Sequence, residues 1–173
     1  MNNIKKVLLI ISGGIAAYKS LDLIRDLRNH NINVRSILTN GGSQFITPLS
    51  LATLTEEKVY QDLFSLINES EMGHIKLSRD ANLIIVAPAT ANLIAKMRAG
   101  IADDLATTTL LATDKPIFIA PAMNVRMWEH AATQENITIL KTRGIQLIGP
   151  EKGDMACGEH GMGRMSEPAK IAD

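Results

Sequence analysis

The sequence lacks the features that mark several large classes of protein. It contains a single cysteine, so no internal disulfide can form and a reducing compartment is expected. Aromatic residues make up 3% of the chain, and 18 basic residues are balanced by 18 acidic ones. We therefore expect neither a base-stacking platform nor a basic surface for nucleic acid or an anionic membrane.

Long apolar runs are also missing. No stretch approaches the ~20 apolar residues that a transmembrane helix needs. Lys5 and Lys6 precede an apolar run, as in a signal peptide, but the run is short and stops at Ser12-Gly13-Gly14 with no cleavage-like segment after it. A first buried strand explains this run better, and we expect a cytoplasmic protein without a membrane segment.

The chain does contain strands and helices in alternation. Residues 83–87 are apolar without alternation, which predicts a strand buried on both faces that ends at Pro88. Other strands are expected at 5–12, 33–39, 116–120 and 145–148, and helices at 15–30, 43–54, 72–79, 93–98, 104–112 and 127–143. Lys19 falls on the polar face of the first helix. The pattern predicts one domain over residues 1–173, an α/β doubly wound parallel sheet that is Rossmann-like, in three layers.

The C-terminal region differs from this pattern. Five of the glycines lie within residues 149–163, together with Cys157. That density argues against a regular element, so we expect a mobile glycine-rich flap at about residues 151–165. Ser166-Glu167-Pro168 is typical of a helix start.

Hydroxyl and amide side chains follow three of the predicted strands. Ser12 follows the first, Thr39 the second, and Thr90 and Asn92 the strand at 83–87. The G-x-G-x-x-G fingerprint, an acidic residue after the second strand and a P-loop are all missing. Each loop alone could be an ordinary turn. Three of them at neighbouring strand ends suit one phosphate and a polar ring edge, which favours a mononucleotide such as FMN over a dinucleotide.

Few side chains are placed to do chemistry. His74 precedes the buried strand and is a candidate base, with a structural histidine as the alternative. Asn124 follows a strand end, where it could donate its amide to a carboxylate or cap a helix. Cys157 lies on an exposed flap and could be a reactive thiol or an incidental one. The histidines are too scattered for a metal site, and none is expected.

Six segments, in order along the chain, resemble the flavin-containing cysteine decarboxylases, and among them the phosphopantothenoylcysteine decarboxylases of coenzyme A biosynthesis. The segments are SGGIAAYKS (12–20), ITPLSLATLT (46–55), MGHI (72–75), APATANLIAKMRAGIADDL (87–105), PAMNVRMW (121–128) and ACGEHGMGRM (156–165). The resemblance covers essentially the whole chain.

The resemblance implies a role for particular residues. His74 matches the catalytic histidine, Asn124 the asparagine that binds the substrate carboxylate, and Cys157 the flap cysteine. Met123 and Ala156 would also contact substrate. Flavin contacts would be Ser12, Gly14, Ile15, Thr39, Thr90, Ala91 and Asn92. Leu93 stands where the family motif has a threonine, so a hydroxyl contact at that position is not expected.

The implied reaction is the FMN-dependent decarboxylation of 4′-phospho-N-pantothenoylcysteine to 4′-phosphopantetheine and CO2. FMN would oxidise the cysteinyl thiol to a thioaldehyde, which supplies the electron sink for loss of CO2. FMNH2 would then reduce the resulting ene-thiolate, with Cys157 as proton donor. Family members form homotrimers or tetramers of trimers with interfacial sites, and they are often fused to a phosphopantothenoylcysteine synthetase.

Other functions of the same fold are weighed against this one. A peptidyl-cysteine decarboxylase releases the ene-thiol without reducing it, and the cysteine-bearing flap disfavours it. A flavin-binding regulatory subunit of the halotolerance type can lack a catalytic residue, whereas His74, Asn124 and Cys157 are all present. A prenyltransferase that modifies FMN is disfavoured by the segments at 121–128 and 156–165.

Overall fold

A parallel sheet forms the centre of the protein, and the computed structural model describes residues 5–63 and 73–173. The sheet has six strands in the order β3-β2-β1-β4-β5-β6. These strands are β1 (Lys6–Ile11), β2 (Asn33–Leu38), β3 (Val59–Tyr60), β4 (Leu83–Ala89), β5 (Ile117–Pro121) and β6 (Gln146–Leu147). The strand order reverses between β1 and β4, which is the switch point of a doubly wound sheet.

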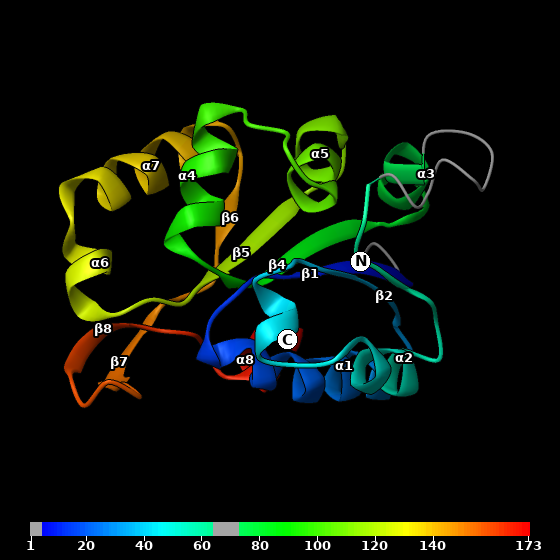
Figure 1. Ribbon diagram of the computed structural model, residues 1–173, viewed down its shortest axis with the longest axis horizontal. Helices are drawn as coiled ribbons and strands as arrows, with labels where there is room; N and C mark the ends of the chain where they lie inside the picture. The colour runs from blue at the N-terminus through cyan, green and yellow to red at the C-terminus, as the bar shows by residue number, and fades with distance from the viewer. Residues whose placement is uncertain (1–4, 64–72) are drawn as a thin grey trace.

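Helices cover both faces of the sheet (Figure 1). One face carries α1 (Lys19–Asn29), α2 (Pro48–Thr55) and α8 (Pro168–Ala172), and the other carries α3 (Gly73–Asp80), α4 (Ala91–Ala99), α5 (Leu105–Ala112) and α7 (Ala131–Thr142). β1 supplies both cores, because Leu8 and Ile10 pack on one side and Leu9 and Ile11 on the other. The prediction of a three-layer α/β fold is confirmed. Across the described ranges, no helix combines the length and apolar character needed to span a bilayer.

β4 is buried along its whole length, as the apolar run predicts, but it does not end at Pro88. It continues to Ala89, which pairs with Pro121 of β5 after a register shift that begins at Val86. A proline fits at this bulge because an irregular ladder does not need the missing N–H. The extra length carries the chain to Thr90, where α4 begins.

The helix expected at 127–143 is two helices. α6 (Val125–Glu129) and α7 meet at His130, whose backbone is extended with φ −61° and ψ 134°. The Nδ1 of His130 accepts a hydrogen bond from the Ala132 N–H at 3.1 Å and so caps α7. The expected helix at 72–79 is confirmed from Gly73 onward as α3, and residue 72 lies outside the described residues.

The glycine-rich tail is regular, so the expectation of no regular element at 151–165 is wrong. β7 (Glu151–Asp154) and β8 (His160–Arg164) form an antiparallel hairpin apart from the main sheet. Glycine is needed on β8 because a Cβ at Gly163 would overlap the carbonyl oxygen of Met123. The Met123 N–H donates to the Gly163 carbonyl at 3.0 Å. The hairpin is therefore seated on the loop after β5, and its mobility stays a prediction.

Candidate active site

The loops after β1, β2 and β4 line a cavity of about 530 Å³, here called the strand-end cavity. It lies at the carboxyl ends of the strands, beside the point where the strand order reverses. Polar residues supply much of its lining, and these are Ser12, Thr39, Asn40, Gln61, Thr90, Asn92, Lys96, Asp103 and Asp104. Position and size are both typical of a ligand site in a doubly wound sheet.

Ser12 joins two of these loops. Its buried hydroxyl donates to the Pro88 carbonyl at 2.6 Å and accepts a hydrogen bond from the Thr90 N–H at 3.2 Å. Thr90 in turn caps α4, because its Oγ1 accepts from the Leu93 N–H at 3.2 Å. The hydroxyls predicted to meet a ligand thus also fix the shape of the rim, and the first turn of α4 opens onto the cavity.

The β1 and β2 loops touch through glycine. The Thr39 hydroxyl donates to the Ile11 carbonyl at 3.2 Å and accepts from the Gly42 N–H at 3.0 Å. A Cβ added at Gly13 would lie 3.0 Å from the Gly41 carbonyl carbon, closer than real Cβ atoms approach backbone with ease. The cavity is therefore bordered by main-chain atoms at Gly13 and Gly41. Main-chain atoms also form the sites in which backbone N–H groups bind a phosphate.

The two acidic residues that line the strand-end cavity, Asp103 and Asp104, both have partners: one is in an ion pair and the other caps a helix. Lys96 donates to both carboxylate oxygens of Asp103 at 2.8 Å, which lowers the pKa of Asp103 and raises that of Lys96. Asp104 caps α5 by accepting from the Thr107 N–H at 2.7 Å. Both carboxylates are therefore partly neutralised, which leaves the cavity able to take an anionic group.

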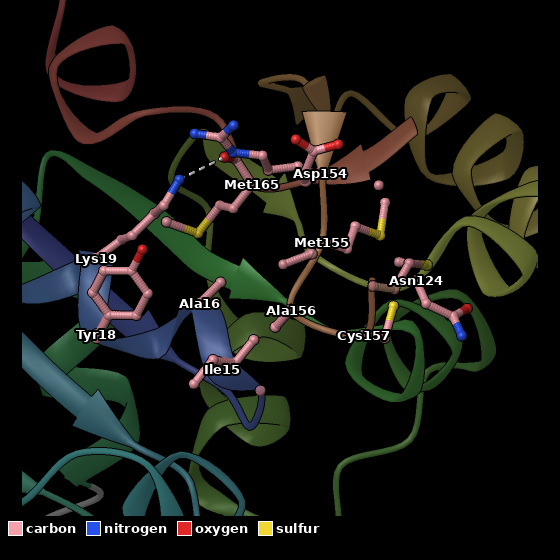
Figure 2. Close-up of a pocket in the computed structure, with 15 residues that line it drawn as sticks. Ile15, Ala16, Tyr18, Lys19, Asn124, Asp154, Met155, Ala156, Cys157 and Met165 are labelled. Atoms are coloured by element: carbon pink, nitrogen blue, oxygen red, sulfur yellow. Dashed lines mark hydrogen bonds between the residues drawn. The ribbon is translucent and has the colours of Figure 1, made fainter. Parts of the chain in front are cut away.

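A second cavity of about 340 Å³ adjoins the first and is here called the hairpin cavity. Gly13 lines the strand-end cavity, whereas Gly14 and Ile15, at the start of the 3-10 helix η1 (Ile15–Tyr18), line the hairpin cavity. The hairpin cavity also holds four of the predicted site residues, which are Met123, Asn124, Ala156 and Cys157 (Figure 2). The fold therefore brings Asn124 and Cys157, from separate parts of the chain, into one cavity.

Asn124 caps a helix, which is one of the two roles predicted for it from the sequence. Its Oδ1 accepts from the Met127 N–H at 2.8 Å at the start of α6. Because the oxygen of the amide is used in this bond, the group left for a ligand is the NH2 donor. The cap is thus compatible with donation to a carboxylate, and that second role stays a prediction.

Cys157 lies in the exposed turn of the hairpin and is a free thiol. Its Sγ donates to Glu159 Oε2 at 3.7 Å. The turn is closed by the Met155 N–H, which donates to the Glu159 carbonyl at 2.9 Å. The Cys157 thiol is therefore reached both from the hairpin cavity and from solvent.

His74 and Ala91 line neither cavity. His74 is half-buried in the first turn of α3, which packs against α5 and β1. Figure 1 shows α3 at the end of the molecule opposite the hairpin. Within one chain the structure therefore does not bring His74 together with Asn124 and Cys157.

Lys19 contradicts its sequence-based placement on a solvent-facing side of α1. It is only 8% exposed, lines the hairpin cavity, and donates to Glu167 Oε1 at 2.9 Å and to the Met165 carbonyl at 3.3 Å. Arg164 of β8 lines the same cavity. The sequence gives these residues no signal beyond their place in the segments at 12–20 and 156–165. Lys19 could not be paired with Glu167 from the sequence, because the two residues are 148 positions apart.

Comparison with known proteins decides the family. The flavoprotein family model matches residues 1–173. This chain belongs to the flavoprotein family. The coenzyme A biosynthesis bifunctional protein CoaBC of Haemophilus influenzae is 50% identical over 169 residues, which cover 98% of this flavoprotein and 42% of CoaBC. The flavoprotein thus spans less than half the length of the curated relatives it matches.

Solved structures resemble the flavoprotein over nearly their whole length. A cysteine-to-serine mutant of PPC decarboxylase, complexed with pantothenoylaminoethenethiol, has a TM-score of 0.87 and 33% identity, and covers 98% of this chain and 95% of its own. The FMN-binding protein AtHal3 has a TM-score of 0.84 and 34% identity, with 98% and 94% covered. A flavin is accordingly the ligand to test against the strand-end cavity, and the cavity's size, backbone lining and helix N-terminus fit one.

Proposed function

We propose that this flavoprotein catalyses the FMN-dependent decarboxylation of 4′-phospho-N-pantothenoylcysteine to 4′-phosphopantetheine and CO2 in coenzyme A biosynthesis. The observation that carries the proposal is that Asn124 and Cys157 line one cavity, which adjoins the strand-end cavity through the Gly13-Gly14 turn. The names of CoaBC and of PPC decarboxylase support the choice of substrate.

FMN is the flavin that the strand-end cavity suits best. No acidic side chain follows β2 to hold the ribose of a dinucleotide, and the α4 N-terminus can accept one phosphate. The description of AtHal3 as an FMN-binding protein supports this choice. Bound FMN would supply a reversible hydride acceptor, which a cysteinyl carboxylate needs because its carbanion otherwise has no electron sink. The proposed contacts are Ser12, Gly14, Ile15, Thr39, Thr90, Ala91 and Asn92. Ser12, Thr39, Thr90 and Asn92 line the strand-end cavity, Gly14 and Ile15 line the hairpin cavity, and Ala91 begins α4 beside Thr90.

Asn124 would bind the substrate carboxylate. Its Oδ1 is held by the Met127 N–H, so the cap fixes the orientation of the amide. The NH2 group would donate to the carboxylate and hold it where loss of CO2 follows. Met123 and Ala156, which line the same cavity, would border the cysteinyl end of the substrate.

Cys157 would deliver a proton to the ene-thiolate in the reductive half of the reaction, for which a bound flavin would supply the hydride. Its contact with Glu159 Oε2 gives the thiol a route to regain a proton from solvent. The solved PPC decarboxylase complex supports this role, since a mutant with serine in place of a cysteine is the one that holds an ethenethiol. A peptidyl-cysteine decarboxylase would need no such donor.

His74 would act as base on a substrate that a neighbouring subunit binds. This arrangement requires a homo-oligomer, proposed as a trimer or a tetramer of trimers, because α3 lies at the end of the molecule opposite the β7–β8 hairpin of its own chain (Figure 1). The bifunctional name of CoaBC supports a phosphopantothenoylcysteine synthetase as the partner activity, fused or separate. A free thiol at Cys157 suits the reducing cytoplasm.

The deciding experiment incubates the purified protein, loaded with FMN, with 4′-phospho-N-pantothenoylcysteine and identifies the products by mass spectrometry. Formation of 4′-phosphopantetheine with CO2 is expected. A product lighter by two hydrogen atoms would instead indicate an enzyme that releases the ene-thiol. Unchanged substrate, from protein that retains its flavin, would contradict the proposal and favour a regulatory flavoprotein.

A further inference from the structure

One wall of the strand-end cavity is a continuous stretch of chain. The first turn of α4 lines the cavity with Asn92 and Leu93, and the first turn of α5 lines it with Leu105 and Ala106. The α4–α5 connection, residues 100–104, joins the two helices (Figure 1), and its last two residues also line the cavity. The shape of this wall therefore depends on how the connection is held.

The α4–α5 connection has few neighbours at its start. Gly100 ends α4 with a positive φ of 70°, and apart from its chain neighbours none of the described residues has an atom within 4 Å of a Cβ added there. Ile101 follows and is 45% exposed. A main-chain bond holds this beginning to α4, since the Ile101 N–H donates to the Lys96 carbonyl at 3.0 Å. Farther along, side chains hold the connection in place.

Lys96 holds the connection from the second turn of α4. Its Nζ donates to both carboxylate oxygens of Asp103 at 2.8 Å, and the two side chains are 23% and 54% exposed. This hydrogen bonding raises the pKa of Lys96 and lowers that of Asp103, so both partners are charged at neutral pH. The next residue, Asp104, caps α5 by accepting from the Thr107 N–H at 2.7 Å. The ion pair therefore ties α4 to the start of α5 through two successive residues.

We propose that the Lys96–Asp103 ion pair holds the α4–α5 connection against the strand-end cavity and so slows the release of bound flavin. This inference rests on the flavin site of the proposed function and uses no step of the decarboxylation. Both partners line the cavity, so the connection can move away from it when the pair opens, and the flavin then loses contacts on that side. Lys96 and Asp103 are positioning residues, because they act on the flavin through the wall that they hold.

Two other roles of the pair predict different results. Lys96 is the one cation among the described residues that line the cavity, so a direct bond to the flavin phosphate is the first alternative. In that case loss of the Asp103 charge would free Lys96 for the phosphate and slow the release of FMN, with riboflavin unaffected. A pair that only stabilises the fold would change the melting temperature and leave flavin release unchanged. A tie that holds the connection instead predicts faster release of both flavins when either charge is removed.

The experiment measures the rate at which the loaded protein releases flavin. Protein loaded with FMN, or with riboflavin, is diluted far below its dissociation constant, and the rise in fluorescence of free flavin gives the rate. Lys96→Gln and Asp103→Asn remove the two charges in turn, and Lys96→Arg keeps a charged donor for Asp103. Glu135→Gln is the matched control, since it breaks the 3.1 Å pair of Arg98 with Glu135, which ties α4 to α7 and lines neither cavity.

Lys96→Gln and Asp103→Asn should each release FMN about threefold faster than the wild type, and riboflavin by the same factor. The double variant should be no faster than the single ones, because either substitution removes the same ion pair. Lys96→Arg and Glu135→Gln should release flavin at the wild-type rate.

Wild-type release rates in folded Lys96→Gln and Asp103→Asn proteins would overturn the inference, and so would opposite changes in the two variants. A lower melting temperature with unchanged release would leave the pair a role in stability alone and would overturn the inference as well. A wild type that binds no flavin would overturn both this inference and the proposed flavin site. A wild type that retains flavin but releases no CO2 from the substrate would overturn the decarboxylation alone.

Discussion

The two cavities are built in different ways. The strand-end cavity is bordered by loops that continue directly from buried strands, and Ser12 and Thr39 fix those loops by hydrogen bonds to main chain. The hairpin cavity is closed by a hairpin that belongs to no strand of the main sheet and meets the rest of the fold where Gly163 pairs with Met123 and Gly161 packs on Val125. Substitutions that disturb the strand-end cavity should therefore leave the hairpin cavity intact, and substitutions in the hairpin cavity should leave flavin binding intact.

The largest effect is expected for Asn124→Asp, which acts only on the hairpin cavity. Aspartate keeps an oxygen to accept from the Met127 N–H, so the α6 cap survives. It has no amide donor and repels the substrate carboxylate, so CO2 release should fall by about a hundredfold or more. Steady-state CO2 release measures this loss, and flavin absorbance should be unchanged. Unaltered CO2 release would remove Asn124 from the substrate site.

Cys157→Ser should separate the two halves of the reaction. The oxidative half needs the flavin and Asn124, whereas only the reductive half needs the thiol proton. Without oxygen, the variant should release about one CO2 per bound flavin and then stop with the ene-thiol as product. Mass spectrometry of a single turnover tests this. A normal yield of 4′-phosphopantetheine would contradict the donor role.

Two glycine substitutions should break one cavity each. In Gly13→Ala the new Cβ would press on Gly41, and flavin should bind about tenfold more weakly while the hairpin stays in place. In Gly163→Ala the new Cβ would overlap the Met123 carbonyl, which should cost roughly 1–3 kcal/mol of stability and lower turnover with flavin binding retained.

Gly144→Ala is the matched control for Gly163→Ala. Gly144 also has positive φ, but apart from its chain neighbours none of the described residues has an atom within 4 Å of the added Cβ. Flavin titration and turnover measured side by side give the comparison. Equal loss of flavin binding in Gly13→Ala and Gly163→Ala would show that the two cavities are not independent.

The smallest effect concerns the tie at Glu167. Hydrogen bonds from Lys19 and then Arg164 hold the pKa of Glu167 below its ordinary value of 4.5. A lowered carboxyl pKa stabilises the fold above pH 4.5, and that contribution is lost as the pH falls through the lowered pKa. Glu167→Gln should therefore lower Tm slightly at pH 7 and have no effect at the acid end.

Thermal unfolding between pH 7 and pH 3 measures the difference between Glu167→Gln and the wild type. Glu129→Gln, an exposed carboxyl on α6, is the control and should leave the pH profile of Tm unchanged. A parallel shift of the Glu167→Gln profile at all pH values would show that charge is not what Glu167 contributes.

Sequence patterns predicted most of the sheet because a strand that is buried on both faces is a continuous run of apolar residues. The run at 83–87 and the strand at 33–39 needed no knowledge of the rest of the chain. The predicted end of β4 at Pro88 was wrong because the strand forms a bulge against β5, where the missing N–H of proline is not needed. The sequence near Pro88 does not show that β5 is the neighbouring strand. The single helix predicted at 127–143 was wrong because the backbone of His130 is extended, although the helical pattern of the sequence runs on through this residue.

The candidate site was predicted in part for the same reason. Thr90 and Asn124 follow strands, and each lines a cavity, while their roles toward flavin and substrate stay predictions. The hairpin escaped prediction because Gly161 and Gly163 are required by the close approach of Val125 and Met123, and not by a local sequence pattern. Lys19 escaped because helical periodicity places a lysine in solvent unless a distant partner such as Glu167 is known.

The hydroxyl of Ser12 has a kinetic consequence. Because it joins the Pro88 carbonyl to the Thr90 N–H through protein groups alone, the fold itself assembles the mouth of the strand-end cavity. Capture of a flavin should then involve little loss of chain entropy, with an association rate of about 10⁵–10⁷ M⁻¹s⁻¹ that is set by diffusion and orientation. Newly synthesised chains would therefore be ready to take up a flavin once α4 and the start of α5 have packed beside the loops after β1, β2 and β4.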